Sequence, residues 1–332
     1  MLDAVLVIVI ILAVCFDFIN GFHDTANSIA TSVSTRVLTP RIAVIMAACL
    51  NFIGALVSHS VAKTISSGIV SSNVQNFVVI AALIAAIIWD LITWHFGIPS
   101  SSSHALIGGL VGAAIAYSGS LNIIIWKGVL EKVIIPLIAS PILGFVLGFL
   151  FMKLLFMLLR RFSQSYVNSK FSKLQIVSAA WMAFSHGNND AQKSMGIITF
   201  ALIGAGLLPK NSNVPIWVMI LCAIAMALGT SIGGWRIIKT VGVNMIKLQP
   251  INGFAAETAA ALVIQAATAI GAPVSTTHVI SSAIMGVGAS KRLSAVRWGL
   301  ARNIVWAWLL TIPTTVLLGA VITLILKVVS GN

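Results

Sequence analysis

Apolar runs about as long as a bilayer is thick dominate this chain. A helix needs roughly 20 apolar residues to cross the hydrocarbon core, and about ten runs approach that length, near 4–20, 42–62, 77–96, 105–126, 133–159, 174–199, 216–235, 253–271, 278–289 and 303–327. Hydrophobic residues make up 59% of the chain and charged residues 8%, which excludes an ordinary soluble domain. We therefore predict an all-α, polytopic protein of the cell membrane.

Two polar stretches interrupt this pattern, and we expect each to break the helix that contains it. Residues 20–28 read N-G-F-H-D-T-A-N-S, and residues 186–194 read H-G-N-N-D-A-Q-K-S. Because an ionisable side chain is costly at membrane depth, an intramembrane Asp is by default a functional residue. Pro, Gly and Ser clusters beside several runs, and the shortness of 278–289, predict broken or re-entrant helices, which a membrane tolerates where the backbone lines a cavity or is buried in protein.

Basic residues predict the orientation of the chain. Cytoplasmic loops of membrane proteins are enriched in Lys and Arg, and the middle of this chain holds Lys153, Arg160, Arg161, Lys170 and Lys173. Counting runs from this loop places both termini outside. It also places fourteen of the twenty basic residues inside. The net charge of +13 is thereby explained by orientation, and no nucleic-acid partner is expected.

In this topology the run that leads to Asp24 travels inward across the membrane, and the run that leads to Asp190 travels outward. A second pair of motifs recurs in the same order: P-S-S-S-S-H at 99–104, expected near the inside, and P-V-S-T-T-H at 273–278, expected near the outside. We predict two inverted repeats, residues 1–159 and 174–332, joined by a basic cytoplasmic linker at 160–173. Inverted repeats with broken helices are typical of secondary transporters, whose substrate site lies near the midplane.

The four motifs supply the candidate site. On one helix face Asp24, Asn27, Ser28 and Thr31 follow the spacing i, i+3, i+4, i+7, and Asp190, Lys193 and Ser194 repeat its start. Hydroxyls and free backbone N–H groups at helix starts after Pro99 and Pro273 would bind an anion. The further substrate-binding candidates are Ser101, Ser102, Ser103, Ser275, Thr276 and Thr277, and the supporting candidates are His23, His104, His186, Asn189, Gln192 and His278. No cofactor or resident metal is expected. A donor-rich pocket flanked by carboxylates suits a small oxyanion that carries a proton or travels with cations.

The paired stretches G-F-H-D-T-A-N-S and H-G-N-N-D-A-Q-K-S resemble the signatures of the inorganic phosphate transporter family, PiT. The resemblance covers nearly the whole chain and includes G-F-A-A-E-T-A at 253–259. It implies uptake of inorganic phosphate, driven by protons in many bacterial members and by sodium in others. The signature acids map onto Asp24 and Asp190, and the signature Asn maps onto Asn27. Glu257 matches a Glu of sodium-coupled members, so Asp24, Asp190 and Glu257 are the coupling-ion candidates.

Two departures favour proton coupling. Sodium-coupled members carry a further Glu where this chain has Asn51, and often an Asn where it has Lys193. A fixed ammonium three residues after Asp190 would take the place of a bound cation. In the plainer alternative, Lys193 contacts phosphate directly. Proton stoichiometry, transport of free phosphate or of a metal complex, and assembly into a homo-oligomer all stay open.

Other functions fit these residues less well. A sodium-coupled phosphate symporter or a sulfate permease would share the fold, although sulfate has no proton for an acceptor Asp to bind. An ion channel would require rings of ligands from several chains. A membrane-embedded hydrolase would need one nucleophile and one base, such as a Ser of 101–103 with His104 and an Asp, and a duplicated arrangement does not suit it. We therefore expect a transporter and not an enzyme.

Overall fold

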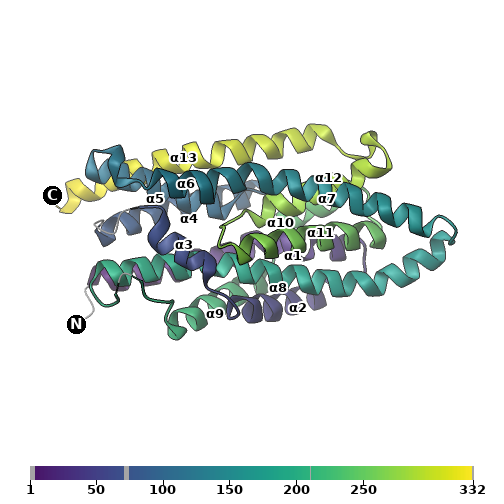
Figure 1. Cartoon of the computed structure of the whole chain (residues 1–332), viewed down its shortest axis with the longest axis horizontal. Coiled ribbons are helices and arrows are strands. Elements are labelled where there is room, and N and C mark those ends of the chain that lie inside the picture. The colour runs from purple at the N-terminus through teal and green to yellow at the C-terminus, as the bar shows by residue number, and fades with distance from the viewer. Residues whose placement is uncertain (1–3, 71–74, 210, 331–332) are drawn as a thin grey trace.

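The computed structural model describes residues 4–70, 75–209 and 211–330, which form an elongated bundle of helices (Figure 1). The predicted all-α class is confirmed. Two large apolar clusters of buried residues fill the bundle.

The same order of elements occurs twice. The first half consists of the long helix α1 (Ala4–Ser34), the pair α2 (Pro40–Ala55) and α3 (Ser60–Gly68), the pair α4 (Asn76–Phe96) and α5 (Ser102–Ser118), the short 3-10 helix η1 (Leu121–Ile123), and a continuous helix made of α6 (Trp126–Val129), the π-helical η2 (Leu130–Ile134) and α7 (Ile135–Leu159). The second half consists of α8 (Gln164–Gly204), α9 (Ile216–Ile232) with α10 (Trp235–Ile238) and η3 (Lys239–Asn244), the pair α11 (Pro250–Ala269) and α12 (Thr276–Lys291), the 3-10 helix η4 (Leu293–Ala295), and α13 (Trp298–Ser330).

Several of these helices are long and apolar enough to cross a bilayer. Within the described residues they are α1, α4, the continuous helix 126–159 and α13. Two bent pairs pass the same test only together: α2 with α3, bent by 66°, and α9 with α10 and η3, bent by 63°. Helix α8 has 41 residues, but the polar stretch 186–194 lies in its middle. The chain is therefore a multi-pass membrane protein.

The pairs α4–α5 and α11–α12 are helical hairpins whose turns meet inside the bundle. Helix α5 runs alongside α13, with Gly112 against Val316 and Lys327 Nζ 2.7 Å from the carbonyl oxygen of Tyr117. Helix α12 runs alongside α7 towards the other end of the bundle. At their starts Ser103 Oγ donates to the carbonyl oxygen of Val274 at 3.1 Å. The motifs at 99–104 and 273–278 were expected near opposite membrane faces. This expectation is wrong, because each hairpin carries its motif to the centre of the bundle.

The expectation that residues 20–28 and 186–194 break their helices is also wrong. Helices α1 and α8 run unbroken through both stretches, and the polar side chains are buried against other helices. The glycines serve close packing instead. A Cβ on Gly21 would lie 2.5 Å from the Met226 carbonyl oxygen of α9, and one on Gly187 would collide with the backbone of Asn51 in α2. The breaks lie between α2 and α3, between α9 and α10, and at the hairpin turns.

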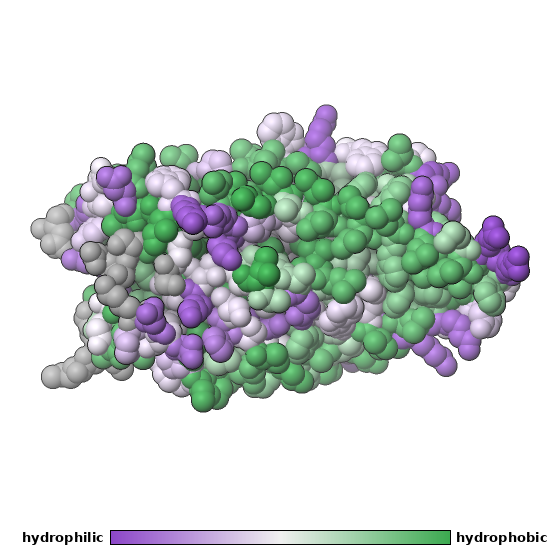
Figure 2. Space-filling model, in the orientation of Figure 1, coloured by the Kyte–Doolittle hydropathy of each residue, from purple (hydrophilic) through white to green (hydrophobic). Residues whose placement is uncertain are grey.

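The basic segment in the middle of the chain is mostly helical. Helix α7 ends at Leu159 and α8 begins at Gln164, where Ser163 Oγ accepts a hydrogen bond from the Tyr166 N–H at 3.3 Å. Only residues 160–163 of the predicted linker 160–173 therefore lie outside helices. This connection lies at the right end of Figure 1, where Figure 2 shows hydrophilic residues, and both ends of the chain lie at the left end.

Candidate functional site

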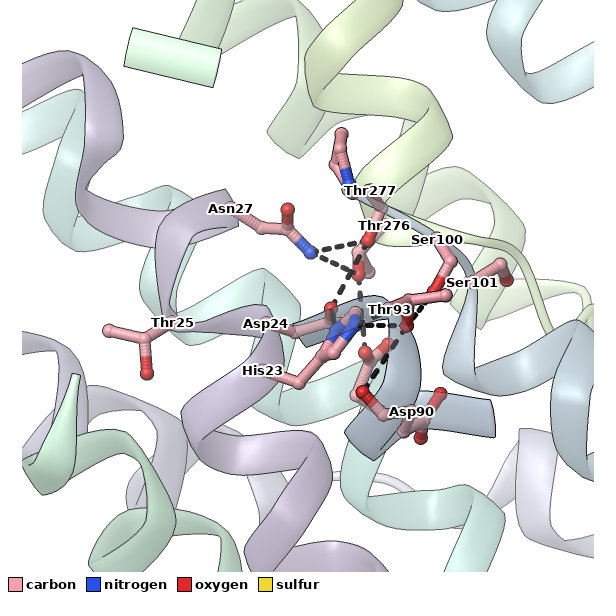
Figure 3. Close-up of polar contacts among 12 residues, drawn as sticks. His23, Asp24, Thr25, Asn27, Asp90, Thr93, Ser100, Ser101, Thr276 and Thr277 are labelled. Carbon is pink, nitrogen blue, oxygen red and sulfur yellow. Dashed lines mark hydrogen bonds and ion pairs between the residues drawn. The ribbon is translucent and has the colours of Figure 1, made fainter. Parts of the chain in front are cut away.

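Asp24 of α1 and Asp190 of α8 lie in the middle of the bundle, both buried, and the first turn of α12 bridges them. Thr277 Oγ1 donates to Asp24 Oδ1 at 3.3 Å, and Thr276 Oγ1 donates to Asp190 Oδ2 at 3.1 Å. Asn27 Nδ2 reaches both threonine hydroxyls, at 2.9 and 3.2 Å (Figure 3). Three of the four sequence motifs thus converge on one buried cluster.

A buried cation accompanies Asp190. Lys193 Nζ lies 2.6 Å from Asp190 Oδ1, one turn along the same helix, and the lysine is 1% exposed. On the other side His186 Nε2 lies 3.4 Å from Asp190 Oδ2, and His186 Nδ1 lies 3.1 Å from Asn51 Oδ1. A buried carboxylate requires such compensation, because desolvation of an unpaired charge costs several kcal/mol.

Asp24 is linked to the first hairpin by hydrogen bonds. His23 Nδ1 lies 2.6 Å from Asp24 Oδ1, and His23 Nε2 lies 3.1 Å from Thr93 Oγ1 in α4. Ser100 of P-S-S-S-S-H donates to Thr93 Oγ1 at 2.7 Å (Figure 3). The fourth motif therefore reaches the site through Thr93 and His23. The figure shows Thr25, by contrast, pointing away from this cluster.

Asp24, His186 and Asp190 could together hold a cation. One donor atom of each lies within 4.8 Å of the others, and all three side chains are buried. Two carboxylates and an imidazole are ligands that divalent cations accept. The absence of a resident metal stays a prediction.

The two halves repeat one further contact. Asn189, adjacent to Asp190, donates to Thr268 Oγ1 of α11 at 2.8 Å, just as His23, adjacent to Asp24, contacts Thr93 of α4. Sequence reasoning missed both threonines. Their signal is positional, since each precedes the Pro of its hairpin motif by five or six residues.

Several predicted substrate ligands make structural contacts. Ser101 Oγ and Ser275 Oγ cap the starts of α5 and α12, accepting from the N–H of His104 and of His278, each at 3.2 Å. Ser103 joins the two hairpin turns, as described above. Ser28, Ser102 and Ser194 are also buried. A role for these serines in substrate binding stays a prediction.

Two further candidates lie away from the Asp24–Asp190 cluster. Gln192 Oε1 accepts hydrogen bonds from the backbone of Val61 and Ala62, at 2.8 and 3.2 Å, and so supports the start of α3. Glu257 of α11 accepts hydrogen bonds from Thr31, Ser178 and Gln175, and it joins α1, α8 and α11. Its partners are uncharged, so Glu257 forms a separate carboxyl site.

His104 and His278 support the hairpin turns. Their ring centroids lie 5.0 Å apart, and the ring of Trp308 stacks on His278 at 4.1 Å. Trp308 Nε1 also donates to the Pro99 carbonyl oxygen at 3.0 Å. Helix α13 thereby holds both hairpin motifs in place.

Comparisons with known proteins match nearly the whole chain. A family model described as the phosphate transporter family matches residues 20–169 and again 160–319. A Bacillus subtilis protein named "Probable low-affinity inorganic phosphate transporter" is 51% identical over 336 residues, covering 99% of this chain and 100% of the relative. A Rhizobium meliloti protein of the same name is 52% identical over 317 residues, covering 95% and 94%. A solved structure titled "The sodium-dependent phosphate transporter" matches with a TM-score of 0.88 and 28% identity, over 98% of this chain and 100% of that one.

Proposed function

Since the chain belongs to the phosphate transporter family, we propose that it takes up inorganic phosphate across the cell membrane by secondary active transport. Its relatives are named as transporters, which are not enzymes. The observation that carries the proposal is the bridging of Asp24 and Asp190 by Thr276 and Thr277. Two acidic residues of opposite repeats and one hairpin turn then share a single substrate site.

The chemistry of this cluster suits a phosphate that still carries a proton. The carboxylates accept the phosphate hydroxyl, while the Lys193 ammonium, the threonine hydroxyls and the first N–H groups of α12 donate to its oxygens. Ser28 Oγ and Asn27 Oδ1 are buried without a hydrogen-bond partner among the described residues. Leaving a buried polar group unpaired costs about 1–3 kcal/mol, so these atoms support a polar ligand. Sulfate has no proton to donate to Asp24 or Asp190 and is disfavoured.

Protons are the coupling ions that the site supports best. Moving one net negative charge inward against 100 mV costs about 2.3 kcal/mol, which a cotransported proton removes. The Lys193 ammonium lies 2.6 Å from Asp190 and takes a position that a sodium ion would otherwise use. Asn51 offers an amide, not a carboxylate, and contacts His186. We assign proton binding to Asp24 and Asp190, with Glu257 as a further carrier.

Alternating access would follow from the opposed repeats. In Figure 1, α1 starts at the left end of the bundle and α8 at the right end. Each hairpin turn is held by a threonine of the opposite bent pair. Thr64 Oγ1 of α3 donates to the Gly271 carbonyl oxygen at 2.7 Å, and Thr240 Oγ1 of η3 donates to that of Gly97 at 2.9 Å. We infer that the Thr64–Gly271 contact closes the outer side and call it the outer latch. The Thr240–Gly97 contact closes the inner side and is the inner latch, and the two open in turn.

Replacing one latch should loosen one hairpin turn only. Thr240→Val removes the bond to Gly97, and Thr64→Val is its matched control at Gly271. Because a hydrogen bond contributes about 1 kcal/mol, we expect backbone hydrogen exchange to speed up roughly five-fold at residues 97–101 in the first variant and at 269–275 in the second. Equal exchange at both turns in both variants would contradict the assignment.

Thr276→Val should weaken phosphate binding more than it weakens the fold. In the proposed complex the Thr276 hydroxyl donates to a charged phosphate oxygen, and such a hydrogen bond is worth about 1.5–3 kcal/mol. Without it, the affinity for phosphate should fall at least ten-fold in a binding titration. The control is Ser275→Ala, which removes the cap of α12, costs about 1 kcal/mol of stability and should mainly lower the melting temperature. If Thr276→Val instead lowers the melting temperature and leaves binding unchanged, its hydroxyl is a packing group. Ser102→Ala tests the first hairpin in the same way.

Uptake of labelled phosphate into liposomes tests the function itself. Purified protein should accumulate phosphate, and a tenfold excess of sulfate should leave the rate nearly unchanged. Equal competition by sulfate would indicate a general oxyanion permease. Single-channel currents would indicate a channel.

A further inference from the structure

A polar cavity lies at the end of the bundle that carries the α7–α8 connection. Its volume is about 570 Å³, and it lies where η3 leads into α11 and where α12 leads into α13. Its polar lining residues are Lys247, Gln249, Asn252, Lys291, Arg292 and Arg297, together with Ser294. We call it the basic pocket. It is separated from the Asp24–Asp190 cluster by the length of α12, since Thr276 lies in the first turn of that helix and Lys291 is its last residue.

Four cationic side chains line the basic pocket without a compensating carboxylate. They come from three segments: Lys247 from the connection before α11, Lys291 and Arg292 from the end of α12, and Arg297 from the residue before α13. Five of the six acidic residues that the structure describes are buried inside the bundle, and the sixth, Glu131, lines a different pocket. Within the described ranges, no carboxylate therefore neutralises the basic pocket.

Orientation in the membrane explains why the residues at this end are basic, but not why four of them line one cavity. Lys153 and Lys170, near the α7–α8 connection, are exposed at the same end of the bundle, but they lie over the rings of Phe149 and Tyr166, at 4.8 and 5.6 Å, and not in this cavity. The four cations of the basic pocket are exposed as well, yet all four line one cavity. Charges that serve only orientation require no shared cavity. Four of them around one cavity raise its positive potential and concentrate anions there.

The start of α11 adds to this potential. Gln249 and Asn252 form a capping box in its first turn, and both line the pocket. The N-terminal end of a 20-residue helix carries a partial positive charge. Together with lysine and arginine donors, it matches the chemistry of a phosphate group, whose oxygens accept several charge-assisted hydrogen bonds.

We propose that the basic pocket is a second anion site, which binds the phosphate group of inorganic phosphate or of an anionic phospholipid headgroup. The pocket joins the end of α12 to the end of η3. Helix α12 carries Thr276 and Thr277 in its first turn, and η3 carries Thr240, the inner latch. A bound anion holds these two elements together and so links its occupancy to the opening of the inner side.

The test compares two variants with matched charge loss. Lys291→Gln/Arg292→Gln removes two cations from the basic pocket, and Arg160→Gln/Arg161→Gln removes two exposed cations at the same end but outside it. The native chain and both variants are placed in nanodiscs of phosphatidylcholine, with or without phosphatidylglycerol. In a second arm inorganic phosphate is titrated in phosphatidylcholine nanodiscs, on chains that also carry Asp190→Asn, so that binding at the transport site does not contribute.

We expect at least one probe to raise the melting temperature of the native chain and of the Arg160/Arg161 variant by about 2–4 °C, and the rise to disappear in the Lys291/Arg292 variant. A rise with phosphatidylglycerol identifies a lipid headgroup, and a rise with phosphate identifies the free anion. Lys247→Gln/Arg297→Gln is a second pocket variant, used if the first does not fold. Equal shifts in pocket and control variants, or no shift with either probe, would overturn the proposal. The readout does not involve uptake, so it stands or falls separately from the transport function.

Discussion

Asp190→Asn and Asp24→Asn should each reduce phosphate uptake to the background of empty liposomes while the protein stays folded and inserted, with a lower melting temperature in Asp190→Asn, which leaves the buried Lys193 ammonium unpaired. Both carboxylates are buried at the centre of the bundle, and each accepts a hydrogen bond from the first turn of α12. An amide keeps the shape of the side chain. It cannot carry the coupling proton, however, and its NH₂ group cannot accept the phosphate hydroxyl.

The control for these variants is Glu131→Gln. Glu131 is exposed on η2, away from the cluster, so the loss of its charge should leave uptake within about two-fold of the native rate. Melting temperatures and size-exclusion profiles report folding. Uptake near the native rate by either aspartate variant, with the fold intact, would remove the assignment of the substrate site.

Lys193→Met should abolish uptake and also destabilise the protein. Its ammonium pairs with Asp190 Oδ1 at 2.6 Å, and both side chains are buried. Removing one partner of a buried pair leaves an uncompensated charge and costs about 3–5 kcal/mol. The melting temperature should therefore fall by several degrees, and phosphate should lose its one buried ammonium donor in this cluster.

The double variant Lys193→Met with Asp190→Asn separates the two effects. It removes both charges, so most of the lost melting temperature should return, because a buried ion pair contributes little beyond mutual compensation. Uptake should stay absent, because the donor and the acceptor are both gone. If the double variant is no more stable than Lys193→Met, the pair is not the electrostatic unit that its geometry indicates.

Sequence patterns predicted the polar residues whose burial in a membrane costs free energy. A carboxylate at bilayer depth and a recurring Ser/Thr cluster after a Pro are rare enough to indicate a site, and Asp24, Asp190, Thr276 and Thr277 do lie together. The repeated order of motifs likewise predicted two similar halves, and the element order repeats accordingly. These patterns can be recognised in the sequence because a membrane tolerates few polar and ionisable groups at its centre.

Other features have no distinct sequence signal. A Gly in a polar stretch indicates either a helix break or a close helix contact, and at Gly21 and Gly187 it is the contact. Helix α4, with 21 apolar-rich residues, is long enough to span, so length alone could not distinguish a crossing from one arm of a hairpin. Single threonines such as Thr64, Thr93 and Thr240 acquire a role only from the segment that packs against them.

The same limit applies to hydroxyl clusters. Six residues of the two hairpin motifs were predicted as substrate ligands, yet a serine at a helix start is favoured equally as a cap. Ser101 and Ser275 make cap contacts, whereas Thr276 and Thr277 face the carboxylates. Which hydroxyl of a cluster turns inward depends on where the helix begins, and that is set by packing between the hairpins.

Uptake of labelled phosphate into liposomes under separately imposed proton, sodium and voltage gradients is the most direct test of proton-coupled phosphate transport by the Asp24–Asp190 site. The Lys193 ammonium beside Asp190 and the amide of Asn51 predict that sodium is dispensable. Uptake should follow an inward proton gradient in sodium-free buffer and collapse when a protonophore is added. Uptake that requires sodium and ignores the proton gradient would contradict the account, because Lys193 would then not stand in for a bound cation.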